Sequence, residues 1–413
     1  MSYYKTYIIK YIVYSIIFVH SFLIAGTTGK IKGKVIDKDT DEPLIGCNIL
    51  VEGTTSGAAT SLDGTYFILN VPPGKYNLIA TMIGYKKVTV QNVEVSSDFT
   101  TSISLALQTE VVSGEEVIVF ASQNKIIKDL TSSTSVVSSE DFDLLPVTEI
   151  SEVLEIQAGY IDGHLRGGRS GEVSYWVDGI AVTDAYNGNA ATSINKNSIE
   201  EMQVISGAFN AEYGHAMSGI VNIITKDGSN QTKAYLSSYL GDFISNKSSL
   251  FQNISDIQLS STKNLDLSLN GPIIKDKLFY FTNARSIRYE GPYSGKRIFN
   301  YYNVSYFDST GSFVVSKPTV LNGDTVYTGY GDNSYVPMDW NEHNYFQLKL
   351  IYKFSPLTKI RFTRINDNKV SQYYDRMYKY NPDGALNHND VSETNIFQIT
   401  KNFNKNTFIN FGG

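Results

Sequence analysis

The sequence predicts a mainly β protein in three parts: a small β-sandwich, a mixed α/β unit, and the first strands of an incomplete transmembrane antiparallel β-barrel. Turn signals recur about every ten residues near the N-terminus, as in sandwiches. Short helical patterns and Gly-rich motifs follow, and long alternating strands fill the C-terminal part. The aromatic content agrees, because 29 Tyr and 21 Phe against 2 Trp suit strands and half-buried rings at wet interfaces.

Length and charge limit the class of protein. The 413 residues are 42% apolar, which is enough for folded cores in several domains. The formal net charge is -6, and no Lys/Arg cluster offsets it. We therefore expect no nucleic-acid partner, since such proteins carry a basic patch.

Residues 1–26 have the pattern of a secretory signal peptide. Two lysines precede an apolar run over residues 11–24, and Ala25 and Gly26 are small residues suited to cleavage. The run is shorter than the ~20 residues that a spanning helix needs. A retained N-terminal anchor is the alternative.

Residues 30–107 predict the sandwich. Tyr76, Leu78, Ala80 and Met82 alternate with Asn77, Thr81 and others, as in a strand with one buried face. The only cysteine, Cys47, can form no intrachain disulfide, and we expect it to be a small buried residue. Four turn signals separate the strands: Asp39-Thr40-Asp41, Asp63-Gly64, Pro72-Pro73-Gly74 and Gly84.

Residues 108–135 are rich in Ser, Thr, Glu and Lys and predict a linker. Within it, an acidic pair precedes a β-prone apolar run, a composition that can add as a strand to a partner's sheet edge. The alternative is the first strand of the next unit, and the two roles do not exclude each other. The segment consists of Glu115, Glu116, Val117, Ile118, Val119 and Phe120.

Residues 136–228 predict the α/β unit. Thr148 is expected to cap a short helix with one apolar face, and Ser138 with Asp141 predicts another helix start. Val177-Asp178-Gly179 is expected to form a tight hairpin, because Asp-Gly tolerates the positive φ angles of such a turn.

Residues 232–413 predict long strands. Leu265 and Leu267 face away from Asp266, and Phe346 faces away from Lys349. Short turns at Gly271-Pro272 and Ser355-Pro356 contrast with a segment of residues 289–343, a pattern typical of outer-membrane barrels with long extracellular loops.

The strand count is too small for a closed transporter barrel. About six to eight strands are expected here, whereas a plugged transporter has about 22. Open edges would be prohibitive in lipid, because each unsatisfied backbone group costs several kcal/mol. We therefore expect Gly413 to be an artificial end.

Three spaced motifs carry a family resemblance: Leu-Arg-Gly-Gly-Arg over 165–169, Tyr-Trp-Val-Asp-Gly-Ile over 175–180, and a Tyr-Gly to Asn-Ile-Ile-Thr-Lys run over 213–226. Together they resemble the plug domain of TonB-dependent outer-membrane receptors. The resemblance implies structural or gating roles for Arg166, Gly167, Arg169, Val177, Asp178, Gly179, Tyr213, Gly214, Gly219, Asn222, Thr225 and Lys226.

Arg166 and Arg169 are expected to brace the plug, because a guanidinium pairs in bidentate fashion with carboxylates and such pairs are costly to break when buried. Solvated arginines in a flexible Gly-rich turn are the alternative.

Residues 30–107 resemble the carboxypeptidase regulatory-like domain, which implies a transthyretin-like sandwich. This domain commonly precedes TonB-dependent receptors of the Bacteroidetes type. The matching residues are 33–37, 43–46, 63–67 and 73–76, closing on Gly84-Tyr85.

The two resemblances imply a receptor in the cell outer membrane of a Gram-negative bacterium, with its N-terminal domain in the periplasm. It would import an extracellular ligand such as a siderophore, glycan, peptide or vitamin, using energy from TonB and its inner-membrane motor proteins. Segment 115–120 stands where the family keeps its TonB box. Outer-membrane lipid and a surface lipoprotein are further partners, and the ligand itself is not readable. The alternative is a surface adhesion or assembly protein anchored by the barrel.

No catalytic, cofactor or metal site is expected, so the chain is not predicted to be an enzyme. None of the five His residues has the His-x-x-x-His or His-x-x-Glu spacing of a zinc site. A zinc peptidase, suggested only by the name of the regulatory-like domain, would need such a site.

Overall fold

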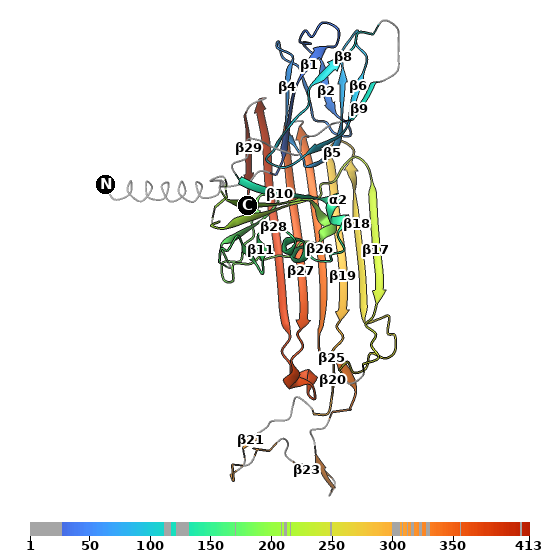
Figure 1. Ribbon diagram of the computed structural model, residues 1–413, viewed down its shortest axis with the longest axis vertical. Coiled ribbons are helices and arrows are strands. Elements are labelled where there is room, and N and C mark those ends of the chain that lie inside the picture. The colour runs from blue at the N-terminus through green and yellow to red at the C-terminus, as the bar shows by residue number, and fades with distance from the viewer. Residues whose placement is uncertain are drawn as a thin grey trace, which may run out of the picture.

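The structure is a computed structural model with three parts along its long axis (Figure 1). The sandwich lies at one end, and the mixed unit lies against a wall of long strands. The predicted signal peptide lies outside the described residues. These are 27–110, 117–120, 132–169, 171–207, 209, 213–214, 216–247, 250–299, 306–307, 309–311, 313–314, 318–321, 324–327, 331–355, 357–404 and 407–413.

The N-terminal part is a sandwich of two sheets, as predicted. One sheet contains β4 (Thr65–Val71), β1 (Gly29–Asp37), β7 (Thr100–Ser102) and β8 (Leu105–Leu107). The other has the order β3 (Gly57–Ala59), β2 (Asn48–Val51), β5 (Gly74–Thr81), β6 (Val88–Val95) and β9 (Val117–Phe120).

One apolar core lies between the two sheets. It contains Leu78, Ala80 and Cys47, all fully buried, so the predicted inward face of β5 is confirmed. Cys47 is a free thiol, and burial raises its pKa to about 11. The predicted turns also lie between strands, except that Gly74 of Pro72-Pro73-Gly74 is already the first residue of β5.

The pairing of strand β9 shows that one of the two roles predicted for segment 115–120, the first strand of the mixed unit, was wrong. Val117–Phe120 pairs in parallel with β6 of the sandwich, so it is not the first strand of the mixed unit. That strand is β10 (Ser132–Ser138), which begins before the predicted limit at residue 136. β6 would otherwise end the sheet with an unpaired edge, and a nearby β-prone run satisfies it. The domain limits as a whole remain predictions.

The mixed unit is built on a five-stranded sheet. Its order is β10, β15 (Ile199–Gly207), β16 (Gly219–Thr225), β13 (Val173–Val177) and β14 (Ile180–Ala181). The unit also contains α2 (Ser139–Leu144), α3 (Ile150–Glu155), the 3-10 turn η1 (Lys196–Ser198), and the short pair β11 (Tyr160–Ile161) and β12 (His164–Leu165).

The two helix starts differ in how well the sequence predicted them. Ser138 is the N-cap of α2, and it exchanges hydrogen bonds with Asp141 as predicted. For α3 the prediction was wrong by one residue, because Glu149 is the N-cap in place of Thr148. The Glu152 carboxylate accepts hydrogen bonds from both the Thr148 and Glu149 amides, so the cap comes from inside the helix.

The wall is a seven-stranded antiparallel sheet, which agrees with the expected number of strands. Its strands, in order, are β17 (Lys233–Gly241), β18 (Thr262–Ile274), β19 (Leu278–Glu290), β26 (Trp340–Ser355), β27 (Thr358–Gln372), β28 (His388–Asn404) and β29 (Thr407–Gly412). Among the described strands the sheet does not close, because β17 and β29 do not pair with each other.

Gly271-Pro272 was wrongly predicted as a turn. Both residues lie inside β18, and the turn follows Ile274. Proline is tolerated there because β17 begins to pair with β18 only at Asn270, so one side of Pro272 has no strand neighbour. The other predicted turn is confirmed, since β26 ends at Ser355.

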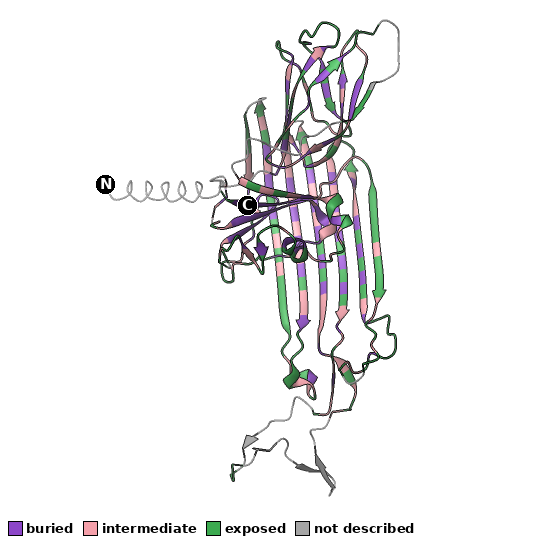
Figure 2. Cartoon of the chain, viewed as in Figure 1, coloured by how far each residue is buried: buried purple, intermediate pink, exposed green. Residues whose placement is uncertain are grey.

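The polarity of the two faces of the wall is the reverse of that in a water-soluble protein, where the buried face of a sheet is apolar. The face toward the mixed unit buries polar residues such as Asp266, Asn283 and Lys349. The opposite face exposes Leu265 and Phe346. Buried and exposed residues alternate along the wall strands (Figure 2). Polar-in and apolar-out alternation is the pattern of membrane barrels, so the predicted fold class is confirmed.

The long connections lie at the end of the wall away from the sandwich (Figure 1). Between β19 and β26 are β20 (Ser294–Lys296), β21 (Tyr306–Phe307), β22 (Phe313–Val314), β23 (Pro318–Leu321), β24 (Asp324–Tyr327) and β25 (Tyr335–Pro337). Two 3-10 turns, η2 (Arg376–Tyr378) and η3 (Pro382–Gly384), lie between β27 and β28. No helix in the described part of the chain is long and apolar enough to cross a membrane.

Candidate functional site: the polar contact between the mixed unit and the wall

The hairpin at Val177-Asp178-Gly179 places a carboxylate at the end of the mixed unit where β13 ends. Asp178 and Gly179 have φ angles of 49° and 81°, which confirms the predicted tight turn. The Thr225 amide and hydroxyl donate to the Asp178 carboxylate at 2.9 and 2.8 Å. The second and third motifs therefore meet, because β13 and β16 run in parallel and end together.

The wall supplies the cation for this carboxylate. The Lys349 ammonium lies 3.2 Å from Asp178 and 2.7 Å from Asp227, and it also donates to the Thr225 carbonyl at 2.9 Å. Arg361 pairs with the other oxygen of Asp227 at 3.1 Å. Both Asp178 and Lys349 are 1% exposed. We call Asp178, Thr225, Asp227, Lys349 and Arg361 the C-terminal latch.

The charges of the C-terminal latch are matched. Burial alone would raise the pKa of Asp227, but Arg361 and Lys349 outweigh it, so the pKa lies below its ordinary value. In addition, Gln398 of β28 donates to the Asp178 carbonyl at 2.5 Å. Three wall strands therefore hold the end of the mixed unit. A cavity of about 620 Å³ opens beside the latch, where the sandwich, the mixed unit and the wall meet.

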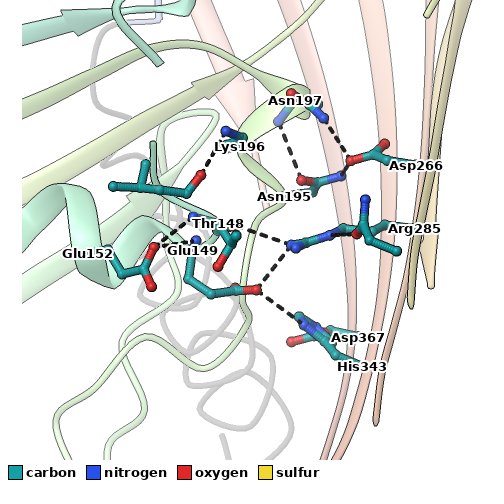
Figure 3. Close-up of polar contacts among 12 residues, drawn as sticks. Thr148, Glu149, Glu152, Asn195, Lys196, Asn197, Asp266, Arg285, His343 and Asp367 are labelled. Carbon is teal, nitrogen blue, oxygen red and sulfur yellow. Dashed lines mark hydrogen bonds and ion pairs between the residues drawn. The ribbon is translucent and has the colours of Figure 1, made fainter. Parts of the chain in front are cut away.

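A second group of contacts holds the start of α3 to the wall (Figure 3). Arg285 of β19 pairs with Glu149 at 3.0 Å and donates to the Thr148 carbonyl at 3.2 Å. His343 of β26 lies between Glu149 and Asp367 of β27, bonding the latter through Nε2. We call Glu149, Arg285, His343 and Asp367 the N-terminal latch.

The N-terminal latch also favours the charged form of its carboxylate. Burial by itself would raise the pKa of Glu149, but the His343 hydrogen bond and the Arg285 charge lower it. Asp367 accepts a further bond from the Ser193 amide at 3.1 Å.

Beside the N-terminal latch, amides of the loop before β15 bind an aspartate of the wall (Figure 3). Asn195 and Asn197 each donate to Asp266 of β18 at 2.7 Å. Asn283 of β19 donates to the same carboxylate at 2.7 Å and accepts from Asn195 at 2.8 Å. These bonds satisfy a carboxylate that is 2% exposed, as a buried charge requires.

The other side of the mixed unit contacts the sandwich. Glu201 accepts a hydrogen bond from the Ser97 amide at 3.0 Å, and Gln203 donates to the Ser97 carbonyl at 2.8 Å. Tyr213 donates to Asp98 at 2.9 Å and lies edge-on against Trp176, with ring centroids 5.5 Å apart. Tyr213 of the third motif therefore joins the two domains.

Arg166 and Arg169 are not part of either latch. Arg166 has a φ angle of 50° and Gly167 of 77°, so the first motif forms a tight turn after β12. Both arginine side chains are exposed, and neither makes an ion pair among the described residues. Their bracing role remains a prediction, while Arg285 and Arg361 of the wall make the ion pairs.

The remaining motif residues lie in or beside β16. Gly219 is required by close approach, because a Cβ there would lie 2.1 Å from Leu165 Cδ2. Asn222 is fully buried, and its amide has no hydrogen-bond partner in the described structure. Gly214 lies in the turn before β16, and Lys226 follows its end, with its amide bonded to the Ser198 carbonyl.

Of segment 115–120, Glu115 and Glu116 lie outside the described residues. Ile118, Val119 and Phe120 are 55%, 45% and 68% exposed on β9. The segment is far from both latches in the chain and lies on the sandwich.

Sequence reasoning missed most of the residues on the wall side. Arg285, His343, Arg361 and Asp367 belong to no motif, and each meets the mixed unit only through the fold. One signal was available, because charged residues such as Lys349 alternate with exposed aromatics along β26. In a barrel, that polar face is the one turned inward.

Comparisons with known proteins agree with this arrangement. The model of the CarboxypepD_reg-like domain matches residues 31–119, and that of the TonB-dependent Receptor Plug Domain matches residues 127–220.

Curated relatives cover the chain more widely. TonB-dependent receptor P26 of Formosa agariphila is 26% identical over 85% of this chain, and SusC of Bacteroides thetaiotaomicron is 29% identical over 48%. The chain spans 33% of the length of P26 and 21% of SusC. Among solved structures, the siderophore receptor PirA from Acinetobacter baumannii aligns with a TM-score of 0.44 and 16% identity, over 65% of this chain and 38% of that one.

An α/β unit held on the polar inner face of a strand wall defines a plugged outer-membrane barrel protein. The two domain matches and the relatives specify it further. The chain contains a CarboxypepD_reg-like domain followed by a TonB-dependent receptor plug domain, and it is similar to TonB-dependent receptors over most of its length. Its relatives are named receptors and transporters. From here on, the mixed unit is called the plug.

Proposed function

We propose that this protein is an outer-membrane transporter that binds an extracellular nutrient and imports it into the periplasm with energy transmitted by TonB. The observation that carries the proposal is the contact between plug and wall. Two charged latches, whose wall residues Lys349, Arg361, Arg285 and His343 are buried, hold the plug on the polar face of a sheet whose other face is apolar. Such a plug blocks a lumen and must be moved before a solute can pass.

Ion pairs such as those of the two latches are suited to a plug that leaves its docked position and later returns to the same position. An apolar contact of the same size would be less specific in position, whereas ion pairs and buried hydrogen bonds define one docked arrangement. Breaking a buried pair costs about 3–5 kcal/mol, so spontaneous opening is rare. Movement of the plug therefore needs work from outside the barrel, and a periplasm-spanning protein such as TonB can deliver it.

The proposed orientation in the membrane is supported by the two ends of the wall. The sandwich lies beside the short turns, including the one after Ser355, and the long connections lie at the opposite end (Figure 1). In outer-membrane barrels the short turns face the periplasm. This supports a sandwich in the periplasm and an extracellular position for the connection between β19 and β26.

TonB and its inner-membrane motor proteins are the proposed energy source, and segment 115–120 is the proposed TonB box. The segment precedes β10, the first strand of the plug, so a pull on it acts directly on the plug. The ligand is proposed to be a siderophore, glycan, peptide or vitamin. A surface lipoprotein and outer-membrane lipid complete the set of partners.

Growth on defined nutrients tests the proposal. A strain lacking the gene is grown with single sources of iron, vitamin B12, oligosaccharide or peptide, and we expect it to fail on one of them. The wild-type gene should restore growth, whereas a gene lacking residues 115–120 should not, although its product reaches the outer membrane. Full rescue by that deletion would contradict TonB-driven import. Normal growth on every source, with lost surface attachment, would instead indicate an adhesion protein.

A further inference from the structure

The cavity beside the C-terminal latch is lined by more positive than negative side chains. Its volume is about 620 Å³, and the sandwich, the plug and the wall all contribute to its lining. Six lysine and arginine side chains line it, against three carboxylates. The latch uses two of these cations and one carboxylate, because Lys349 and Arg361 pair with Asp227. The cations outside the latch therefore outnumber the carboxylates that remain.

Two lysines of the wall stand side by side in this lining. Lys353 of β26 and Lys359 of β27 are direct cross-strand neighbours, and both are partly buried. The Cβ atoms of such a pair lie about 4.5–5.5 Å apart, and like charges placed directly opposite each other are destabilising. Neither lysine forms an ion pair within the part of the chain that the structure describes. An anion between the two ammonium groups would remove their repulsion.

The groups around the two lysines do not neutralise them. The Lys353 ammonium lies 4.8 Å from the centroid of the Phe279 ring, a contact that positions a cation and leaves its charge in place. The Glu52 carboxylate accepts a hydrogen bond from Asn77 at 2.8 Å. Burial raises the pKa of Glu200 to about 7, so this carboxyl group is partly protonated at neutral pH. The cavity therefore has a surplus of positive charge.

From these observations we infer that the cavity is a binding site for a phosphate group, with Lys353 and Lys359 as its two cationic ligands. Lysine binds phosphate as a point charge, and a doubly charged group satisfies two ammonium groups at once. Inorganic phosphate and a phosphate ester share this chemistry.

The size and the far side of the cavity leave room for more than inorganic phosphate. Its volume is within the range of about 300–1,000 Å³ that is usual for small-molecule sites. The sandwich adds the hydroxyl-bearing residues Thr54, Thr55 and Ser56 to the lining, and hydroxyl groups can bind those of a sugar. A ligand here would contact all three parts of the chain and stabilise their docked arrangement by mass action. The site does not depend on TonB-driven import.

Titration calorimetry of the detergent-solubilised full chain tests the site. Inorganic phosphate is titrated at constant ionic strength into a zwitterionic buffer. We expect Lys353→Met/Lys359→Met to bind at least about tenfold more weakly than the wild type, because two charged hydrogen-bond donors are lost.

Lys277→Met/Lys401→Met is the matched control. Both lysines are exposed and lie at the same end of the wall, and neither lines the cavity. This variant should bind phosphate within about twofold of the wild type. Equal weakening in the two double variants would overturn the inference.

Acetylation of the unmodified chain gives a readout that needs no substitution. Peptide mass spectrometry follows the acetylation rates of Lys353 and Lys359, and we expect inorganic phosphate to slow both at least about threefold, since it occupies their ammonium groups. Lys277 and Lys401 should react at unchanged rates. Equal slowing of all four lysines, or equal slowing by sodium chloride at the same ionic strength, would show charge screening and no site. Unchanged rates at Lys353 and Lys359 would also overturn the inference.

Glucose 6-phosphate and glucose distinguish the two sources of the phosphate group. Tighter binding of glucose 6-phosphate than of inorganic phosphate would assign the site to a phosphate ester, and equal binding would assign it to free phosphate. Binding of glucose as tight as that of glucose 6-phosphate would contradict a phosphate site.

Discussion

Lys349 is the residue on which the C-terminal latch depends. Its ammonium contacts Asp178, Asp227 and the Thr225 carbonyl, all within 3.2 Å. Without this cation, Asp178 would remain buried with no charge partner and Asp227 would keep only Arg361. A buried carboxylate without its cation is far more costly than the absence of the whole pair.

We therefore expect Lys349→Met to weaken the docking of the plug by about 3–5 kcal/mol. The measurement is the rate of trypsin cleavage within the plug of the detergent-solubilised chain, together with its thermal unfolding. Lys263→Met is the matched control, because Lys263 is an exposed lysine on strand β18 of the same wall. Equal cleavage rates for the two variants would show that the latch does not hold the plug.

Gly219 gives a second prediction at this scale. A methyl group at this position would lie 2.1 Å from Leu165 Cδ2 and 2.8 Å from the Ile205 carbonyl. Gly219→Ala should destabilise the plug by about 1–3 kcal/mol, the usual cost of overpacking. Urea unfolding followed by Trp176 fluorescence measures it. Gly241→Ala is the control, since its new Cβ would meet only Thr262 at 3.7 Å, and a similar loss there would contradict the steric cause.

The sequence predicted side-chain roles where the partner was close in the chain. Ser138 and Asp141 cap a helix three residues apart, and the Asp178-Gly179 turn is defined by its own two residues. The wall residues that pair with the Glu149 carboxylate lie 136 and more positions away, as with Arg285, so no local pattern indicates them. The sequence favoured Arg166 and Arg169 as braces because of their motif, while the ion pairs come from arginines outside any motif.

At the scale of elements, the contact between β15 and the sandwich depends on pH. Burial raises the pKa of Glu201 from its ordinary 4.5 to about 7, despite the Ser97 and Gln203 hydrogen bonds. The folded chain therefore binds more protons than the unfolded chain between these values. The contribution of Glu201 to stability should therefore fall as pH rises from about 4.5 to about 7, and then level off.

Glu201→Gln tests this dependence, because the amide oxygen can still accept the Ser97 hydrogen bond and has no charge to bury. We expect the variant to be more stable than the wild type at pH 8, with a smaller fall between pH 5 and 7. Glu200, whose pKa burial also raises to about 7, should contribute to the remaining fall. Urea unfolding at several pH values measures it. An unchanged pH profile in Glu200→Gln/Glu201→Gln would contradict the assignment.

The sequence predicted the end of a strand where a local turn preference interrupts it. It did not predict the end where pairing with a neighbouring strand determines how far the strand continues. Asp63-Gly64 interrupts the sandwich strands by its own turn preference. Gly271-Pro272 has the same local preference, yet β18 continues through it because β17 is absent on that side. The pairing of β9 with β6 likewise depends on which sheet edge is open nearby, which the segment itself does not encode.

At the scale of the whole molecule, the exposed apolar face of the wall predicts that a charged side chain placed on it will destabilise the protein in the membrane. Leu267 lies near the middle of β18 on the apolar face. Leu267→Arg should destabilise the inserted protein by about 2–4 kcal/mol, the cost of an arginine at the bilayer midplane. The yield of heat-modifiable protein in outer-membrane fractions measures it. Leu386→Arg is the matched control, because Leu386 is 78% exposed in the connection between β27 and β28. Equal yields would argue against a lipid-facing surface at Leu267.

The latches also bear on the order of assembly. The bonds from Thr225 to Asp178 span 47 positions within the plug, whereas the Lys349 bond to the same carboxylate spans 171. Closing the shorter loop costs less chain entropy, so the plug can form its half of the latch first. When the wall strands assemble afterwards, Lys349 would bind an Asp178 carboxylate that Thr225 already holds in place. In biogenesis, the plug would act as the template around which the wall strands are registered.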